Sequence, residues 1–235
     1  MYKKIILIII IQLNFSLFSY SSTPRQKDAS PTDLQLIIAI DNNDLKKVKI
    51  KLKEGADINT FDKSGYSALH SALTNNHSNI ANFLIEKGAD INAKTTFGET
   101  SLHLVRDTEI AKLLIEKGLN VNAKTNQNLM TPIFSHDIDI AKLLIKAGAN
   151  VNARSIDNNT PLIWYTYSNY IDGVVFLLKN GADINAKNND GNTALQIATN
   201  FHHVEIIKIL TDYSANNNTK DKAKTNQLKS KIFIK

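Results

Sequence analysis

The side chains in this chain that are best suited to acid–base or metal chemistry are its six histidines. Their spacing does not match the H-E-x-x-H pattern that brings two histidines to one metal ion. No serine stands in a G-x-S-x-G elbow, and no glycine-rich loop is present to hold a phosphate group. The absence of cysteine excludes disulfides, thiolate metal sites and cysteine nucleophiles. We therefore expect no catalytic, cofactor-binding or metal-binding residues.

Short Asp-Ile-Asn segments, such as Asp57-Ile58-Asn59, are the other candidates for ligand chemistry. Carboxylate and carbonyl oxygens are the ligands of calcium, but a calcium loop gathers several carboxylates within about a dozen residues. Here the segments recur only once in every 33 residues or so. We therefore expect them to serve the fold.

The net charge of +6 is concentrated at the two ends of the chain. Lys3 and Lys4 lie at the amino terminus, and residues 215–235 carry six lysines against the single acid Asp221. The body between them is nearly neutral, and its net charge gives no electrostatic case for nucleic-acid binding. We expect residues 218–235 to form a basic, disordered tail.

The amino terminus has the pattern of a secretory signal peptide. Lys3-Lys4 precedes an unbroken apolar run from Ile5 to Ile11, and small residues surround Tyr20 at Ser19 and Ser21. The run is shorter than the roughly 20 apolar residues of a membrane-spanning helix. We predict a signal peptide at residues 1–21, a linker at 22–32 and an extracytoplasmic mature protein, secreted or periplasmic. An uncleaved signal anchor is the alternative.

A glycine motif repeats along the rest of the chain. Its copies are Glu54-Gly55-Ala56-Asp57-Ile58-Asn59 and the segments around Gly88, Gly118, Gly148 and Gly181, with a degenerate copy at Ser214. The spacings are 33, 30, 30, 33 and 33 residues, and such a period indicates a solenoid. A second motif follows each glycine in phase, in the forms Ser67-Ala68-Leu69-His70, Thr100-Ser101-Leu102-His103, Thr131-Pro132-Ile133-Phe134, Thr160-Pro161-Leu162-Ile163 and Thr193-Ala194-Leu195-Gln196.

These motifs resemble the T-P-L-H signature of the ankyrin-repeat family. The resemblance implies an all-α solenoid in which each repeat is a helix–turn–helix followed by a hairpin-like loop. It covers residues 33–217 in about six repeats, with degenerate caps, near 34–66, 67–99, 100–130, 131–159, 160–192 and 193–217. It also implies that His70 and His103 are structural hydrogen-bonding residues. His77 and His202-His203 fall in the turns between helices, where we expect them to be exposed.

Elementary helix chemistry agrees with the resemblance. Ser or Thr opens each motif as an N-cap, proline takes the first helical position twice, and glycine ends each second helix in a left-handed conformation. The motif-to-glycine distance is normally 21 residues but is 18 from Thr100 and 17 from Thr131. The loss is close to one helical turn, so we expect short first helices there and uninterrupted stacking. At the start, Lys47 and Lys51 replace the apolar Ile80 and Leu84, which predicts a polar end face.

Aromatic residues at Trp164, Tyr165, Tyr167 and Tyr170 depart from the other repeats, which place smaller side chains near these positions. Trp and Tyr are enriched at binding hot spots, and we predict that Trp164 and Tyr167 contact a partner. Tyr165 has two open interpretations: partner contact, or repacking against the shortened repeat before it.

The resemblance further implies recognition of a protein partner through loop tips and the exposed side of the first helices. The chain is then a monomeric, non-enzymatic scaffold, either exported to act on another protein or a periplasmic accessory to an enzyme or envelope component. The partner-binding candidates are Lys63, Ser64, Tyr66, Thr74, Thr96, Phe97, Glu99, Ile156, Asp157, Asn159, Trp164, Tyr167, Asn189, Asp190, Asn192 and Asn200. The fourth repeat, where Leu129 replaces the loop glycine and one residue is inserted, allows no assignment.

Overall fold

The computed structural model describes residues 29–134 and 137–215. The predicted signal peptide, residues 22–28 of the predicted linker and the predicted tail lie outside them. The helices are α2 (Pro31–Asp41), α3 (Leu45–Lys53), α4 (Ala68–Thr74), α5 (Ser78–Glu86), α6 (Ser101–Leu104), α7 (Thr108–Glu116), the 3-10 helix η1 (Pro132–Phe134), α8 (Ile138–Lys146), α9 (Pro161–Tyr167), α10 (Ile171–Lys179) and α11 (Ala194–Asn200). Residues 204–215 are also helical.

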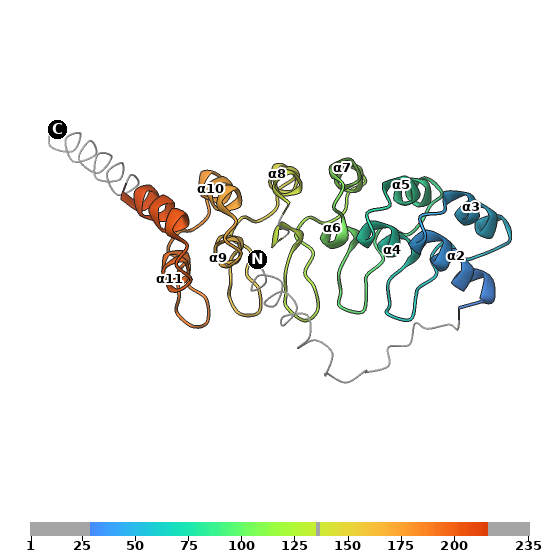
Figure 1. Cartoon of the computed structure of the whole chain (residues 1–235), viewed down its shortest axis with the longest axis horizontal. Coiled ribbons are helices and arrows are strands. Elements are labelled where there is room, and N and C mark those ends of the chain that lie inside the picture. Colours follow the sequence, from blue (N-terminus) through green and yellow to red (C-terminus); the bar gives the residue numbers. More distant parts are fainter. Residues whose placement is uncertain (1–28, 135–136, 216–235) are drawn as a thin grey trace, which may run out of the picture.

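The helices form a single row of pairs joined by hairpin-like loops (Figure 1). The second helices of the pairs lie along one side of the row, the loops project from the opposite side, and the first helices lie between. Within the described residues the β pairing is one isolated bridge, between Phe61 and Ser67. The predicted all-helical solenoid is confirmed.

The ends of the helices are set by the residues that the repeat motif places there. In α4, the Ser67 hydroxyl accepts a hydrogen bond from the His70 amide, and His70 Nδ1 accepts one from the Ser67 amide. The glycine that follows each second helix has a positive φ, 93° at Gly55 and 86° at Gly181. A side chain there would be strained, so glycine stops the helix and turns the chain into the loop.

The first helix begins earlier than predicted. Pro31 opens α2, two residues before the boundary at residue 33, and Ser30 is its N-cap. The Ser30 hydroxyl accepts from the Asp33 amide at 3.1 Å, and the Asp33 carboxylate accepts from the Ser30 amide at 2.9 Å. Aligning the repeats by their glycines places the motif start at Leu34, and the Ser-Pro cap upstream adds nearly one turn.

The core runs through the whole stack. The first five pairs of helices each bury an apolar residue of the first helix and one of the second at the same repeat positions, whereas the equivalent Leu195 of the sixth pair is 36% exposed. The buried first-helix residues are Leu36, Leu69, Leu102, Ile133 and Leu162, and the buried second-helix residues are Val48, Ala81, Ala111, Ala141 and Val174. The pattern continues across the central repeats, so each repeat buries its apolar face against its neighbours.

The shortened first helices are present as predicted. Four residues form α6 and three form η1, whereas α4 and α9 have seven each. The prediction of a polar N-terminal end face is only partly correct. Lys47 on α3 is exposed, but α2 also exposes Leu34 (42%) and Ile38 (56%). These two side chains lie on the face that, in the other repeats, packs against a preceding repeat.

The Asp-Ile-Asn segments hold adjacent repeats together. The side-chain oxygen of Asn59 accepts from the backbone amide of Asp90 at 2.8 Å, and Asn152 accepts from the amide of Asp183 at the same distance. Asn122 bonds to Asn150 in the same way. Their recurrence once per repeat therefore has a structural cause.

None of the helices in the described part of the chain combines the length and the apolar character needed to cross a membrane.

Candidate functional site

The two motif histidines are part of the scaffold. His70 is fully buried, and burial lowers its pKa to about 4. His103 shares a 3.2 Å hydrogen bond through Nε2 with the Met130 carbonyl of the following loop, and burial lowers its pKa too. Both rings are therefore neutral near pH 7 and fixed by helix caps or loops. Within residues 29–134 and 137–215, no three His, Asp or Glu side chains are grouped to hold a metal ion.

The expectation that His77 and His203 are exposed is wrong. Both are half-buried, and each ring reaches the first helix of the preceding repeat. His77 Nδ1 lies 2.8 Å from the Ile40 carbonyl, and His203 Nδ1 lies 2.9 Å from the Thr166 carbonyl. The turn between two helices packs against the end of the neighbouring first helix, so an imidazole there bonds to an end carbonyl. His202 is exposed.

All sixteen predicted partner-binding residues are exposed or half-buried. The structure gathers most of them into two groups. Each loop is numbered here by the repeat whose first helix follows it, so the second loop precedes α4 and the sixth precedes α11. The first group lies in the second and third loops and comprises Lys63, Ser64, Tyr66, Thr96, Phe97 and Glu99. The second lies in the fifth and sixth loops and on α9, and comprises Ile156, Asp157, Asn159, Trp164, Tyr167, Asn189, Asp190 and Asn192. Thr74 and Asn200 end α4 and α11 and belong to neither group.

Hydrogen bonds between loops hold the first group together. The Tyr66 hydroxyl donates to the Glu99 carboxylate at 3.4 Å, and the Thr96 hydroxyl donates to the Ser64 carbonyl at 3.3 Å. Burial and the nearby Glu99 charge raise the pKa of Tyr66 to about 12. This phenol therefore stays protonated and acts as a hydrogen-bond donor.

The second group combines aromatic rings with carboxylates. The Asn189 amide donates to the Asp157 carbonyl at 3.0 Å, which joins the fifth and sixth loop tips. Tyr167 is half-buried beside them, and its pKa is raised by burial and by the charges of Asp190 and Asp157. The charges of two acidic loop residues thus act on the Tyr167 phenol.

Two phenylalanines support the aromatic residues of α9, and neither of them is among the sixteen predicted partner-binding residues. Trp164 meets Phe134 of the short helix η1 edge to face, with ring centroids 6.3 Å apart. Tyr167 meets Phe201 in the same way at 5.5 Å, and Phe201 is 47% exposed. Phe201 is the C-cap of α11, whereas the long first helices α2, α4 and α9 have the polar C-caps Asn42, Asn75 and Ser168. That mismatch was the signal available in the sequence.

Tyr165 is a core residue, which decides between its two interpretations. Its side chain is fully buried, and its hydroxyl donates to the Ile133 carbonyl in η1 at 3.1 Å. It fills space beside the shortened first helix, so repacking is the correct interpretation.

The fourth loop connects the two groups. The Asn126 amide donates to the Phe97 carbonyl of the third loop, and the Ile156 amide of the fifth loop donates to the Asn128 carbonyl, each at 2.8 Å. Leu129 adopts a positive φ of 52°, the conformation that glycine has at Gly98. The loop keeps its turn despite the inserted residue, at some conformational cost. Loop tips therefore form one hydrogen-bonded row.

Paired helices, bonded loops and a continuous core define a helical-repeat solenoid. Comparison with protein families finds a match at residues 16–95 and 133–221 to the model described as ankyrin repeats (3 copies). The chain belongs to the ankyrin-repeat family. A search of curated proteins finds no match. Ankyrin repeats generally mediate protein–protein interaction, and the proteins that contain them are typically non-enzymatic scaffolds.

Proposed function

We propose that this protein is an exported, monomeric scaffold that binds a partner protein through its loop tips and first helices. The observation that carries the proposal is the position of Trp164 and Tyr167. Both are half-buried on α9, which is the first full-length first helix after the shortened α6 and η1.

The change in helix length gives these aromatics a distinct setting. The 3-10 helix η1 has three residues and the neighbouring first helix α9 has seven, so η1 is shorter than α9 by about one turn. We propose that the missing turn leaves a notch in the row of first helices, and that a side chain or a helix of the partner enters it. Rigid aromatic rings supply large contact area there at low entropic cost.

The charges near Tyr167 suggest which side chains fit. Burial is the main cause of the raised pKa of Tyr167, and the charges of Asp190 and Asp157 add to it, so both carboxylates act on this ring. A basic side chain placed against the Tyr167 or Phe201 ring would gain both ion pairing and cation–π attraction. The first group of loop residues would extend the contact along the row.

Export rests on the basic and then apolar amino terminus. An exported protein that acts on a protein of another cell is one form of the proposal. A periplasmic accessory protein that supports a resident enzyme or envelope component is the alternative. Finding the mature chain in the medium favours the first, and finding it in the periplasm favours the second.

The test is capture of partners from an extracytoplasmic extract, with the wild-type chain and the Trp164→Ala/Tyr167→Ala variant as parallel baits. The proposal expects a protein that the wild type retains and the folded variant loses. Equal retention by both baits would place recognition outside the notch.

A further inference from the structure

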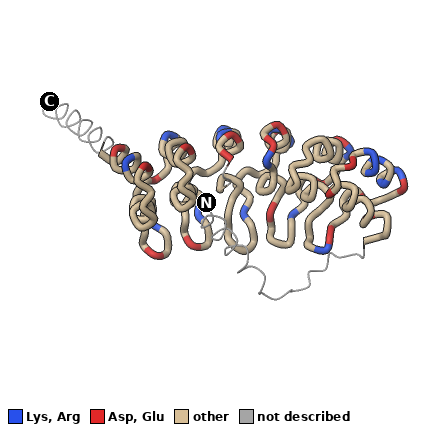
Figure 2. Tube along the Cα trace, viewed as in Figure 1, with Lys and Arg blue, Asp and Glu red and all other residues tan. Residues whose placement is uncertain are grey.

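The helix α3 differs from every other second helix of the stack in its charge. Its sequence, Leu45–Lys53, contains five lysines and no acid, whereas α5 contains no lysine and α7 contains one. Figure 2 shows these lysines gathered at the N-terminal end of the row. No repeat precedes α3 among the described residues, so its outer side has no helix packed on it.

The acids near α3 are used by the fold. Asp33 accepts from the Asp57 amide at 2.7 Å, and Asp41 accepts from the side chains of Ser71 and Asn75. Asp44 caps α3, and it and Glu54 pair with Lys47 and Lys51. Three α3 lysines, Lys46, Lys49 and Lys53, have no ion pair among the described residues.

A fourth lysine extends this charge onto the next repeat. Lys49 Nζ lies 5.2 Å from the centre of the Phe83 ring, and Lys87 Nζ lies 5.8 Å from the same centre. Lys46, Lys49, Lys53 and Lys87 are called the lysine patch below. Glu86 is the only acid in α3 and α5, so the charge of the patch is largely uncompensated.

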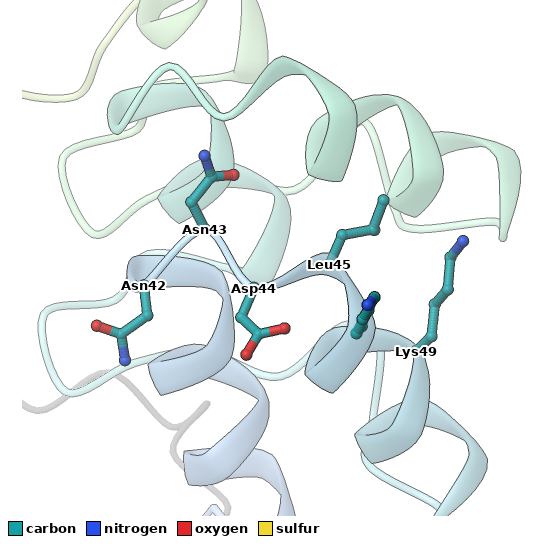
Figure 3. Close-up of a pocket in the computed structure, with 6 residues that line it drawn as sticks. Asn42, Asn43, Asp44, Leu45 and Lys49 are labelled. Carbon is teal, nitrogen blue, oxygen red and sulfur yellow. The ribbon is translucent and has the colours of Figure 1, made fainter.

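Apolar side chains are exposed among these lysines. Ile50 lies on α3 between Lys46 and Lys53 and is 49% exposed. Figure 3 shows an open hollow at the α2–α3 turn, lined by residues that include Asn43 and Leu45, with Leu45 and Lys49 extending from α3 on the same side. Exposed aliphatic groups surrounded by long basic side chains are typical of surfaces that lie in a membrane interface, where the apolar groups enter the headgroup region.

We propose that the lysine patch and Ile50 form a peripheral contact with an anionic lipid surface. Juxtamembrane lysines gain binding energy from acidic headgroups, and the exposed Ile50 adds apolar contact that a purely acidic peptide would not require. The contact uses the second helices, on the side of the row opposite the loops (Figure 1). It is therefore independent of the proposed partner-binding surface and leaves the loops free.

The test compares full-length variants in sedimentation with vesicles of equal parts phosphatidylglycerol and phosphatidylcholine. Reversing three charges with Lys46→Glu/Lys49→Glu/Lys53→Glu should weaken binding at least about tenfold, because each lysine near an anionic surface adds to the attraction. The matched control, Lys112→Glu/Lys117→Glu/Lys146→Glu, changes exposed lysines of the central repeats and should bind almost as the wild type does. Residues 5–11 and the basic tail are identical in all three proteins, so the comparison isolates α3.

Two results would overturn the proposal. One is equal binding of the triple variant and the control, with both proteins folded by circular dichroism. The other is unchanged vesicle binding together with loss of binding to a poly-glutamate peptide, which would make the patch a site for an acidic protein segment.

Discussion

Tyr165 and Gly173 reverse the usual distribution of side-chain sizes in the fifth repeat, because the large side chain lies in the first helix and the small residue in the second. The second and sixth repeats place a small residue in the first helix and a large one in the second, Ala72 with Ile80 and Ala198 with Ile206. Here the first helix carries the large ring, and a Cβ atom on Gly173 would overlap it. The Tyr165 side chain also reaches η1, where its hydroxyl donates a hydrogen bond to the Ile133 carbonyl.

This reversal predicts that Gly173→Ala destabilises the protein. Replacement of a glycine inside a helix by alanine normally raises the free energy of unfolding by about 1 kcal/mol. Overpacking against Tyr165 should instead lower it by about 1–3 kcal/mol. The double variant Tyr165→Ala/Gly173→Ile, which restores the usual pair, should be more stable than Tyr165→Ala alone. Urea unfolding measures all three, and a stabilising Gly173→Ala would refute the tight packing.

The second prediction concerns partner binding. Trp164→Ala and Tyr167→Ala should each weaken binding by about 1–4 kcal/mol, the range of interface hot spots, with little loss of fold. Calorimetric titration with the captured partner measures the change. As controls, Lys222→Ala and Lys224→Ala in the tail should matter much less. Normal binding by both aromatic variants, or abolition of binding by tail deletion alone, would move recognition elsewhere.

The third prediction is that the two halves of the stack unfold together. Trp164 is the only tryptophan, so its fluorescence reports on the fifth repeat. Leu69→Ala in the buried second repeat should cost about 2–5 kcal/mol. Because stacking couples neighbouring repeats, it should shift the fluorescence transition as far as the circular dichroism transition. Separate transitions for residues 33–99 and 160–217 would mean that the stack is broken in the middle.

The fourth prediction is a pH dependence that His70 imposes on stability. Its folded-state pKa of about 4 lies below the ordinary value of 6.5, so protonation favours the unfolded chain. Its contribution is complete above pH 6.5 and is lost as the pH falls toward 4, by up to about 1.4 kcal/mol per pH unit. Urea unfolding at several pH values should show a shallower fall for His70→Gln. Gln196 already makes the same cap with Thr193, so glutamine fits this position. The exposed His202→Gln should leave the slope unchanged.

The fifth prediction concerns export. Protein purified from its native host should begin near residue 22, after cleavage close to Ser21. Amino-terminal sequencing is the measurement. A mature chain that still begins at Met1 and is found in the cytosol would contradict it, whereas Met1 on a membrane-bound chain would indicate the uncleaved anchor.

The sequence by itself determined the repeat, its phase and its helix boundaries, because these depend on local chemistry. An N-cap serine, a proline in the first turn and a glycine after the last turn act within a few residues. The shortened α6 and η1 also follow from the sequence, because the distance from motif to glycine is shorter in these repeats by about one helical turn. The capping pair of Ser30 and Asp33 also indicates the start of α2 at Pro31. Alignment of the repeats by their glycines instead places the start of the first motif at Leu34.

Tertiary structure alone decided how side chains from different repeats share space. The burial of Tyr165 depends on Gly173 eight residues later and on a carbonyl in η1 about thirty residues earlier. The bonds of His77 and His203 likewise reach 37 residues back. A periodic sequence places equivalent positions one repeat apart, but it does not state which of two neighbours fills the space between them. That choice depends on the volumes and hydrogen-bonding groups that meet only once the repeats are stacked.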